Sequence, residues 1–563
     1  MANPVETIKD YISRLKLNTP KDFIFDNDKL IDFLHVKYSI PLITPDSEIK
    51  ATGFDQILHY YKEGYFLFEN EIGETCLALR NILLIYEDFI ARLYYSKIYF
   101  VKADDFEQIL QKQFADQNTY KAINYLTEHT IYFSAKTLDY LKITVGFAII
   151  FFSSIIFFIN SFNLINNIFY FLQNILKAVL FSKGMYKVSD EKTLRISEDP
   201  PIYSILIPLY KEEFKAKSII NAMKNLNYPK DKLDVKIIVE ADDMLTQRAL
   251  YVLDIPKFIQ IIKVPYSLPR TKPKALNYAM SFVLGKYLAV YDAEDVPDPD
   301  QLHKAINAFD ELSEQYVCVQ AKLNFYNADE NILTRLFSIE YTVWFEYLLK
   351  GLSLLDLPVT LGGTSNHFKV DKLREVGFWD AYNVTEDADL GIRLYLKGYK
   401  VHMIDSTTLE EAPTESIGWL YQRSRWIKGF FQTIFIFMKT KKDYKKFSLI
   451  KVFAVYIFVG LSTYSFLFLP WLLLILFFKL NPIIYYLWFV NSFFSISYMY
   501  TIAYVALSSK ESSEVKLTHT IDYVTLIIWP LYFIMHSIAS YRAVWDMLKT
   551  PFKWNKTSHG GEI

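Results

Sequence analysis

The chain has 563 residues, more than one ordinary hydrophobic core uses, so two or three folding units are expected. Hydrophobic residues make up 52% of it and aromatic residues 17%, and the excess gathers in a few long uncharged runs, which indicates a membrane unit. A formal net charge of −1 gives no basic field and argues against a nucleic-acid partner. Cys76 and Cys318 lack metal-ligand spacing, which excludes structural zinc and a disulfide framework and favours reducing cytosol.

Residues 1–140 show mixed helix and strand signals without a catalytic cluster, and we predict a small α+β accessory or regulatory domain in the cytosol. The polar first ten residues do not resemble a cleavable signal peptide. Residues 31–44 weakly resemble the N-terminal domain of type II secretion ATPases, whose relatives can bind a cyclic dinucleotide. The Arg- and Gly-bearing signature of that family is missing, so a docking domain is the favoured interpretation.

Four uncharged runs predict membrane helices, since a span needs about 20 apolar residues. The first run is either one long tilted helix or, slightly better, two tight spans. Lysines gather beside the runs, which predicts a multi-pass protein of the inner, cytoplasmic membrane with its catalytic domain and C-terminus in the cytosol. That orientation requires an even number of spans after the catalytic domain, but three runs follow it, so their number stays open. The runs are 143–176, 452–478, 480–509 and 523–541.

We therefore divide the chain into five parts. After the N-terminal domain come one or more transmembrane segments, an α/β domain with a mostly parallel sheet, a C-terminal set of transmembrane or interfacial helices, and a cytosolic tail. Their bounds are 1–140, 141–182, 186–446, 447–545 and 546–563. Short apolar runs predict strands of the α/β domain at 203–208, 235–239, 259–264 and 287–291.

Two acidic clusters follow predicted strands, at the strand ends where open α/β sheets bind ligands. Glu240 and Asp242 could accept hydrogen bonds from a nucleoside, although a turn capping the next helix is the better interpretation of this cluster taken alone. Asp292, Glu294 and Asp295 put three acids within four residues, where like charges repel unless a cation bridges them. We expect Mg²⁺ or Mn²⁺ there, bound to the diphosphate of a nucleotide sugar.

Two further clusters follow in the chain. Glu386 and Asp387, after Thr385, could supply the base that takes a proton from an acceptor hydroxyl, or form an acidic helix start capped by Thr385. In the segment 422–426, Arg425 offers a fork for phosphate oxygens and Trp426 a flat face for a sugar ring. The alternative is that Trp426 and Phe430 are core residues of an amphipathic helix.

Taken in order, the motifs DAED, TED and QxxRW resemble the signature of processive family 2 glycosyltransferases, the group of cellulose, chitin and hyaluronan synthases. The longer blocks TKPKALNYA (271–279), YDAEDVPDP (291–299), LGGTSNHF (361–368) and NVTEDADLGIRL (383–394) are similar to bacterial membrane enzymes of that family. The resemblance covers residues 200–545. It implies a GT-A fold, a UDP-sugar donor, inversion at the anomeric carbon, and export of the polymer through the protein's own membrane helices.

Carried over by position, the resemblance assigns roles to residues of three kinds. Asp387 is the base, with Glu386 beside it. Asp292 and Glu294 match the metal-binding Asp-x-Asp motif, but Glu replaces the second Asp, so either Glu294 or Asp295 is the second ligand. The remaining residues bind the donor (Glu240, Asp242, Lys272, Lys274, Asp292, Arg425) or the acceptor (Gly363, Gln422, Trp426). In the tail, Trp554 and Lys556 loosely resemble a mobile gating loop, and a basic tail on the bilayer surface is an equal alternative.

Three functions remain in view. The first is a processive, inverting hexosyl- or N-acetylhexosaminyltransferase that makes an exported polysaccharide. The second is a non-processive enzyme that adds one sugar to a membrane lipid. The third is a non-catalytic inner-membrane part of an export or receptor assembly, against which the complete set of acidic clusters argues.

Overall fold

The computed structural model describes residues 95–130, 134–186, 194–439, 449–477, 479–510 and 519–553, with short pieces between residues 28 and 81. These residues form two compact units, described here separately. The first comprises Met1–Lys121 with two short pieces, Ile262–Pro265 and Tyr278–Leu284, and the second comprises the rest. The described pieces of 31–44 are too few to test a cyclic-dinucleotide site.

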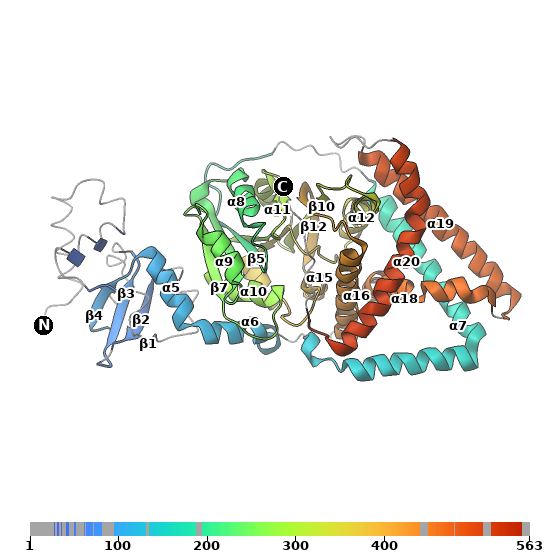
Figure 1. Ribbon diagram of the computed structural model, residues 1–563, viewed down its shortest axis with the longest axis horizontal. Helices are drawn as coiled ribbons and strands as arrows, with labels where there is room; N and C mark the ends of the chain where they lie inside the picture. The colour runs from blue at the N-terminus through green and yellow to red at the C-terminus, as the bar shows by residue number, and fades with distance from the viewer. Residues whose placement is uncertain are drawn as a thin grey trace. The chain divides into compact units, whose positions relative to one another are not determined.

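A four-stranded sheet forms the centre of the first unit, in the order β1-β2-β3-β4 (Figure 1). The alternating burial of β2 and the apolar face of α5 create its core, where the rings of Phe66 and Phe106 lie 5.5 Å apart. The small α+β domain predicted at the N-terminus is confirmed as a class of fold. The elements are β1 (Lys50–Ala51), β2 (Tyr65–Glu69), β3 (Thr75–Leu79), β4 (Lys97–Phe100), α5 (Ala103–Gln113) and the first part of α6 (Ala115–His129), whose residues from Ala122 belong to the second unit.

An eight-stranded mixed sheet forms the centre of the second unit, in the order β7-β6-β5-β8-β11-β10-β12-β9. Strand β5 pairs in parallel with β6 and β8, and β10 pairs in parallel with β12, whereas β11 is antiparallel to both of its neighbours. The predicted α/β class and all four predicted strands are confirmed. The strands are β5 (Tyr203–Leu209), β6 (Leu233–Glu240), β7 (Ile259–Val264), β8 (Tyr287–Val290), β9 (Val296–Pro297), β10 (Tyr316–Phe325), β11 (Asn366–Lys369) and β12 (Lys400–Glu410).

Helices cover this sheet with apolar faces spaced three and four residues apart. On α8, Ile219 and Met223 are buried against the strands, and α11 buries Leu302 and Ile306 in the same core. Because β5, β6 and β8 are neighbouring parallel strands, their carboxyl ends meet at one edge and carry Glu240 and the acids after Val290 to it. The helices of this domain include α8 (Ala216–Asn225), α9 (Met244–Tyr251), α10 (Lys272–Ala279), α11 (Gln301–Glu311), α12 (Ile332–Tyr341), α13 (Leu349–Leu354), α14 (Val370–Glu375), α15 (Glu386–Leu396) and α16 (Ser416–Lys439).

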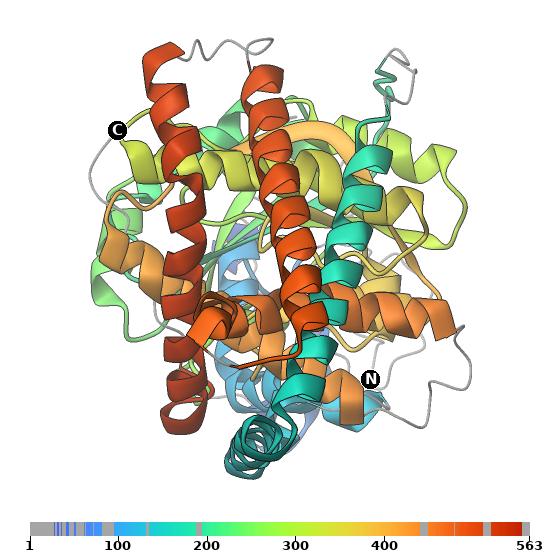
Figure 2. The ribbon, with the colours of Figure 1, turned by 90° about the vertical axis from the view of Figure 1, so that its right-hand side faces the viewer.

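Long apolar helices form the remainder of the second unit, and α7, α19 and α20 run side by side in Figure 2. In the described part of the chain, three helices are long and apolar enough to cross a membrane, and a pair bent by 52° is a fourth if it counts as one span. The first run lies in α7, a 45-residue segment in which two helices meet at a kink, because the backbone leaves helical geometry at Phe158. The run is therefore not one continuous straight helix. The helices are α7 (Tyr140–Gly184), α17 (Leu449–Val455), α18 (Leu461–Leu474), α19 (Pro482–Lys510) and α20 (His519–Lys549).

Two glycines allow α7 to approach the sheet domain closely. A Cβ atom on Gly184 would lie 2.1 Å from the carbonyl oxygen of Tyr347, and one on Gly351 would lie 2.2 Å from that of Leu180. These contacts join α7 to α13 and to the π-helix Thr342–Leu348 that precedes it. A single cavity is therefore bordered by both the sheet edge and the membrane helices.

Candidate active site

A cavity of about 1190 Å³ lies at the carboxyl edge of the sheet and continues between α16, α7, α19 and α20. It brings together ten residues that the sequence predicted for the site, from segments spread over nearly 190 positions. They are Glu240, Lys272, Asp292, Glu294, Gly363, Glu386, Asp387, Gln422, Arg425 and Trp426. Asp242 and Lys274, also predicted to bind the donor, lie outside its lining.

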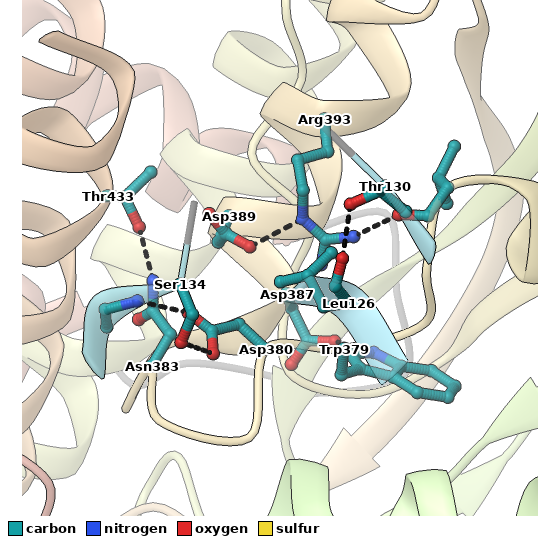
Figure 3. Close-up of polar contacts among 12 residues, drawn as sticks. Leu126, Thr130, Ser134, Trp379, Asp380, Asn383, Asp387, Asp389, Arg393 and Thr433 are labelled. Carbon is teal, nitrogen blue, oxygen red and sulfur yellow. Dashed lines mark hydrogen bonds and ion pairs between the residues drawn. The ribbon is translucent and has the colours of Figure 1, made fainter. Parts of the chain in front are cut away.

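Asp387 is buried in the first turn of α15, with 4% of its surface exposed. The indole N–H of Trp379 donates a hydrogen bond to Asp387 Oδ1 at 3.2 Å (Figure 3). Burial, together with the neighbouring carboxylate of Glu386, raises the pKa of Asp387 well above its ordinary value. A carboxylate with a raised pKa is a stronger base, which suits it to take a proton from a hydroxyl.

Thr385 occupies the N-cap position of α15, and Glu386 and Asp387 lie in its first turn, so the predicted acidic helix start is confirmed. The side chain of Thr385 makes no capping hydrogen bond, so that part of the prediction is wrong. The residue instead lies against α16, where a Cβ atom on Gly429 would fall 2.1 Å from Thr385 Oγ1. Gly429 therefore permits α16 to pack directly on the turn that carries Glu386 and Asp387. This contact fixes the spacing between the acids and the next predicted motif.

Lys272 joins the acidic cluster that follows β8 to the base. Its Nζ lies 2.6 Å from Asp292 Oδ1 and donates a hydrogen bond to the carbonyl oxygen of Gly363 at 2.6 Å. Burial opposes the charge of Lys272, but Asp292, Asp387 and Glu386 outweigh it and raise the pKa of this lysine. The ammonium is therefore held charged inside the cavity, at a place suited to an anionic substrate group.

Asp295 maintains the shape of the acidic loop. Its Oδ2 accepts hydrogen bonds from the Thr364 hydroxyl and, at 2.8 Å, from the backbone N–H of Asp292. Burial, with Asp292 and Glu294 nearby, raises the pKa of Asp295 well above its ordinary value. This engagement favours Glu294 over Asp295 as the second metal ligand beside Asp292.

Acids outnumber bases around this loop. Burial and the charge of Asp295 raise the pKa of Glu410, and Asp295 Oδ1 and Glu410 Oε1 are buried without a hydrogen-bond partner among the described residues. A divalent cation fits such an excess of negative charge. No group of three or more His, Cys, Asp or Glu side chains in the described part of the chain is arranged to hold a metal ion. Asp292 and Glu294 would therefore hold one jointly with substrate oxygens, as Mg²⁺ commonly binds.

The acids after β6 occupy three different environments. Glu240 is 5% exposed and lies 2.9 Å from Lys274, which is fully buried. Asp242 lies 2.5 Å from Arg270 and has a side chain that is 46% exposed. Asp243 caps α9 by accepting the Thr246 N–H, so the capping alternative is correct for this residue alone. Among the predicted donor-binding acids after β6, Glu240 is the one that faces the cavity.

The helix α16 presents Gln422, Arg425 and Trp426 to the cavity. Trp426 is partly exposed and contacts the cavity together with Phe430, which contradicts the core interpretation of this pair. Gln422 Oε1 is buried without a hydrogen-bond partner in the described residues, which makes it an available acceptor for a hydroxyl. Burial lowers the pKa of Arg425, while Glu386 and Asp292 nearby act to raise it.

One charged network was not predicted from the sequence. Arg423 donates two hydrogen bonds to Glu340, at 2.9 and 2.7 Å, and its guanidinium lies 4.4 Å from the centre of the Trp426 ring. On α20, the Tyr532 hydroxyl donates to Glu340 at 2.6 Å, and His536 lies 3.4 Å from the same carboxylate. The network links α12, α16 and α20 behind the predicted acceptor face. Its only sequence signal was a single acid in the apolar, aromatic stretch 336–345.

Thr550, Pro551, Phe552 and Lys553, directly after α20, line the cavity. Lys428 Nζ donates hydrogen bonds to the carbonyl oxygens of Thr550 and Lys553, at 3.1 and 3.0 Å. The ring of Phe552 lies 5.1 Å from that of Tyr382. Trp554 and Lys556, predicted for a gating loop, lie outside the described residues, so that function stays a prediction.

Between the long apolar helices the cavity is lined mainly by uncharged polar groups and aromatic rings, together with Lys177 of α7. Asn174 on α7 donates a hydrogen bond to Asn491 Oδ1 on α19 at 3.0 Å and another to Ser495 at 2.5 Å. Tyr170 and Trp529 add rings to the same lining. Such groups suit a ligand with many hydroxyls, because hydroxyls need hydrogen-bond partners when water is excluded.

Residues 287–507 match the family model described as "Glycosyl transferase family group 2". The segment is therefore similar to family 2 glycosyltransferases, and an α/β sheet whose carboxyl edge carries acids agrees with that similarity. "Probable glycosyltransferase YdaM" of Bacillus subtilis is 30% identical over 235 residues, which cover 41% of this chain and 55% of the relative. "Glucomannan 4-beta-mannosyltransferase 1" of Oryza sativa subsp. japonica is 27% identical over 237 residues, 41% of this chain and 45% of the relative.

The chain thus spans about half the length of the curated relatives it matches. Among solved structures, a mannosyltransferase from Pyrobaculum calidifontis in complex with GDP-Man and Mn2+ aligns with a TM-score of 0.41 at 15% identity, covering 67% of this chain and 99% of that one. S. aureus TarS 1–349 with UDP-GlcNAc aligns with a TM-score of 0.28 at 12% identity, covering 63% and 93%. Structural similarities with TM-scores this low do not identify residues of the site.

Proposed function

We propose that this chain is a membrane-bound, inverting hexosyltransferase that extends a polysaccharide from a nucleotide-sugar donor. The observation that carries the proposal is the meeting of Asp387, Asp292 with Lys272, and Trp426 in one cavity. A base, a charged site for a diphosphate and a platform for a sugar are the three parts that sugar transfer needs. The family match over residues 287–507 supports the same class of reaction.

The proposed transfer is a single displacement. Asp387 accepts the proton of an acceptor hydroxyl, the hydroxyl oxygen forms a bond to the anomeric carbon, and the bond from that carbon to the diphosphate breaks on the opposite face. Lys272 is placed to bind the departing diphosphate, because its ammonium stays charged between Asp292 and the base. Trp426 would stack on the acceptor sugar and so orient the attacking hydroxyl.

A divalent cation, Mg²⁺ or Mn²⁺, would be held by Asp292 and Glu294 and would neutralise charge on the leaving diphosphate. The buried oxygens Asp295 Oδ1 and Glu410 Oε1, which have no hydrogen-bond partner among the described residues, support this assignment because they add to the excess negative charge at the loop. The donor's base would lie toward Glu240. We assign a UDP-sugar, as the sequence resemblance implies. A GDP-sugar is the direct competitor, since mannosyl transfer appears in the names of two relatives.

A polymer is favoured over a single transfer by the continuation of the cavity between α7, α19 and α20. A growing chain could pass along Asn174, Asn491 and Ser495, exchanging hydrogen bonds as it moves. The alternative is an enzyme that adds one sugar to a membrane lipid and uses the same space for the lipid head group. A non-catalytic role in an export or receptor assembly is the third possibility, and the intact acids argue against it.

The deciding experiment incubates the purified full-length chain in membrane vesicles with a panel of UDP- and GDP-sugars and Mg²⁺ or Mn²⁺. Long polymer from one donor, abolished by Asp387→Asn, is the expected result. A single glycolipid would establish the non-processive alternative. Transfer that is unaffected by Asp387→Asn would remove the proposed base, and absence of transfer from every donor would favour the non-catalytic role.

A further inference from the structure

The loop between α14 and α15 holds the proposed base by direct contacts. Within it, Trp379 is fully buried and donates its indole N–H to Asp387 Oδ1 at 3.2 Å (Figure 3). An indole nitrogen can only donate, so Oδ1 is held as the acceptor of this bond and its position is fixed. A Cβ atom on Gly363 would lie 3.7 Å from the second oxygen, Oδ2, which therefore lies on the Gly363 side, where the cavity is.

The backbone of Trp379 is itself anchored. Asn277 Oδ1 accepts the Trp379 N–H at 3.1 Å, and Asn277 Nδ2 donates to the Trp379 carbonyl oxygen at 2.8 Å. The same amide nitrogen donates to the carbonyl oxygen of Ala122 at 2.8 Å. This buried amide thus ties the indole to α10 and to the chain that leads toward α7.

Asp380 makes a second, stronger connection to that chain. It is 1% exposed, and its Oδ1 accepts the Ser134 hydroxyl at 2.7 Å and the Tyr382 N–H at 3.1 Å. Its Oδ2 accepts the backbone N–H of Ala135 at 2.7 Å. Ser134 and Ala135 begin the short 3-10 turn Ala135–Thr137, which ends three residues before α7 begins at Tyr140. One buried carboxylate therefore joins the segment that leads into α7 to the loop that carries Trp379.

We infer that Trp379 and Asp380 are positioning residues for transfer: Trp379 orients the carboxylate of Asp387, and Asp380 fixes Trp379 by anchoring its loop to Ser134 and Ala135. The inference rests on the proposed function, because it assumes that Asp387 is the base. A loop with only a structural role would not need an indole N–H that donates to the base. It would also not need three hydrogen bonds to the buried carboxylate of Asp380. Burial raises the pKa of Asp380 to about 6, and the three donors keep the ionised form usable near neutral pH.

The test compares Trp379→Phe, Ser134→Ala and Ser134→Thr with the wild-type chain in the vesicle assay. Removal of the indole N–H should lower kcat about ten- to a hundredfold, the size expected for a hydrogen bond to a charged group, and leave the KM for the nucleotide sugar within about twofold. Ser134→Ala should lower kcat less, by about threefold to tenfold, and Ser134→Thr should restore it because its hydroxyl can still reach Asp380.

The pH profile separates positioning from simple destabilisation. Glu386, Lys272 and Asp292 face Asp387 and remain in every variant, so loss of the indole donor alone should move the acidic limb of kcat to higher pH. Trp545→Phe on the exposed face of α20 and Ser218→Ala on α8 are matched controls that should leave kcat and the limb unchanged.

Three results would overturn the inference. The first is a Trp379→Phe enzyme with unchanged kcat, and the second is a lower kcat without a shifted limb. The third is a Ser134→Thr enzyme as slow as Ser134→Ala. Should Trp379→Phe fail to fold, as judged by its melting temperature, the Ser134 pair still decides the matter. An active wild type inhibited by Asp387→Asn keeps the proposed function in place while the inference fails, so the two failures are distinguishable.

Discussion

The two ends of the cavity, which we propose bind the donor and the acceptor, hold their charged side chains in different ways. At the donor end, Asp292, Glu386 and Asp387 surround Lys272, and the pKa values of Glu386 and Asp387 are raised, first by burial. At the acceptor end, Arg423 and Glu340 form a matched pair. There burial alone would raise the pKa of Glu340, but Arg423 and His536 outweigh it and lower the pKa to about 2.

The difference distinguishes charged side chains that are available to a ligand from charged side chains that stabilise the fold. Acids with raised pKa values are less stable ionised in the protein than in water, which is tolerable where a cation or a transferred proton relieves them. A carboxylate with a lowered pKa is stabilised by the protein that surrounds it. We therefore expect substitutions of the acids beside Lys272 to reduce activity and spare stability, and substitutions of the Arg423–Glu340 pair to reduce stability first.

The largest effect is expected for Asp387→Asn. An amide cannot accept the proton, so kcat should fall by about 10²- to 10⁴-fold, the usual contribution of a general base. The melting temperature should stay equal or rise, because a buried group whose ionised form is disfavoured has been neutralised. Transfer assays and thermal unfolding of the same preparation provide the measurement. A large loss of stability would show that Asp387 stabilises the fold as Glu340 does, which would contradict the proposed difference between the two ends of the cavity.

Arg423→Met is expected to have the next largest effect, and on stability. It leaves the Glu340 carboxylate without its main partner, which typically costs about 3–5 kcal/mol for a buried pair. The double variant Arg423→Met with Glu340→Gln should recover much of this loss, because no uncompensated charge remains. Denaturation in one detergent measures both. If Arg423→Met has the same free energy of unfolding as the wild type, the ion pair does not stabilise the fold.

Acid should destabilise the protein through the same pair. The pKa of Glu340 is depressed in the folded state from its ordinary 4.5 to about 2, so its contribution is fully present above about pH 4.5 and is lost as the pH falls toward 2. At about 1.4 kcal/mol for each pH unit of pKa difference, the total is on the order of 3 kcal/mol. Stability measured between pH 6 and 3 should fall less steeply in Glu340→Gln than in the wild type. Equal slopes would assign the acid sensitivity to other carboxylates.

Much of the donor end could be predicted from the sequence, because strand ends and short acidic motifs are linear features. Parallel pairing of β5 with β6 and β8 then brings Glu240 and Asp292 to one edge, as the strand pattern requires. Linear motifs do not reveal which of these acids forms an ion pair with a basic side chain nearby and which stays available for a ligand. Asp242, which does not line the cavity, is paired with Arg270, which does. Asp295 accepts hydrogen bonds within its own loop.

The acceptor end could not be predicted, for a different reason. Arg423 and Glu340 are 83 residues apart, and Tyr532 lies 192 residues from Glu340, so their contact exists only after α12, α16 and α20 have packed. Trp379 was equally hidden, because an indole in an apolar context resembles a core residue until its N–H is seen to face Asp387. Hydrophobic periodicity identifies which face of a helix is buried, but not which polar atoms meet there.

The smallest effect is expected within the membrane helices, where the acceptor end continues. Asn174→Ala removes hydrogen bonds to Asn491 and Ser495, and polar contacts between membrane helices average about 0.6 kcal/mol each, so the melting temperature should hardly change. If a growing sugar chain passes these amides, the product should nevertheless become shorter while the initial rate of transfer stays equal. Ser182→Ala, which removes a hydrogen bond within α7, is the matched control and should leave product length as it is. A product of wild-type length from Asn174→Ala would show that elongation does not depend on these amides and would remove this support for a path between the helices.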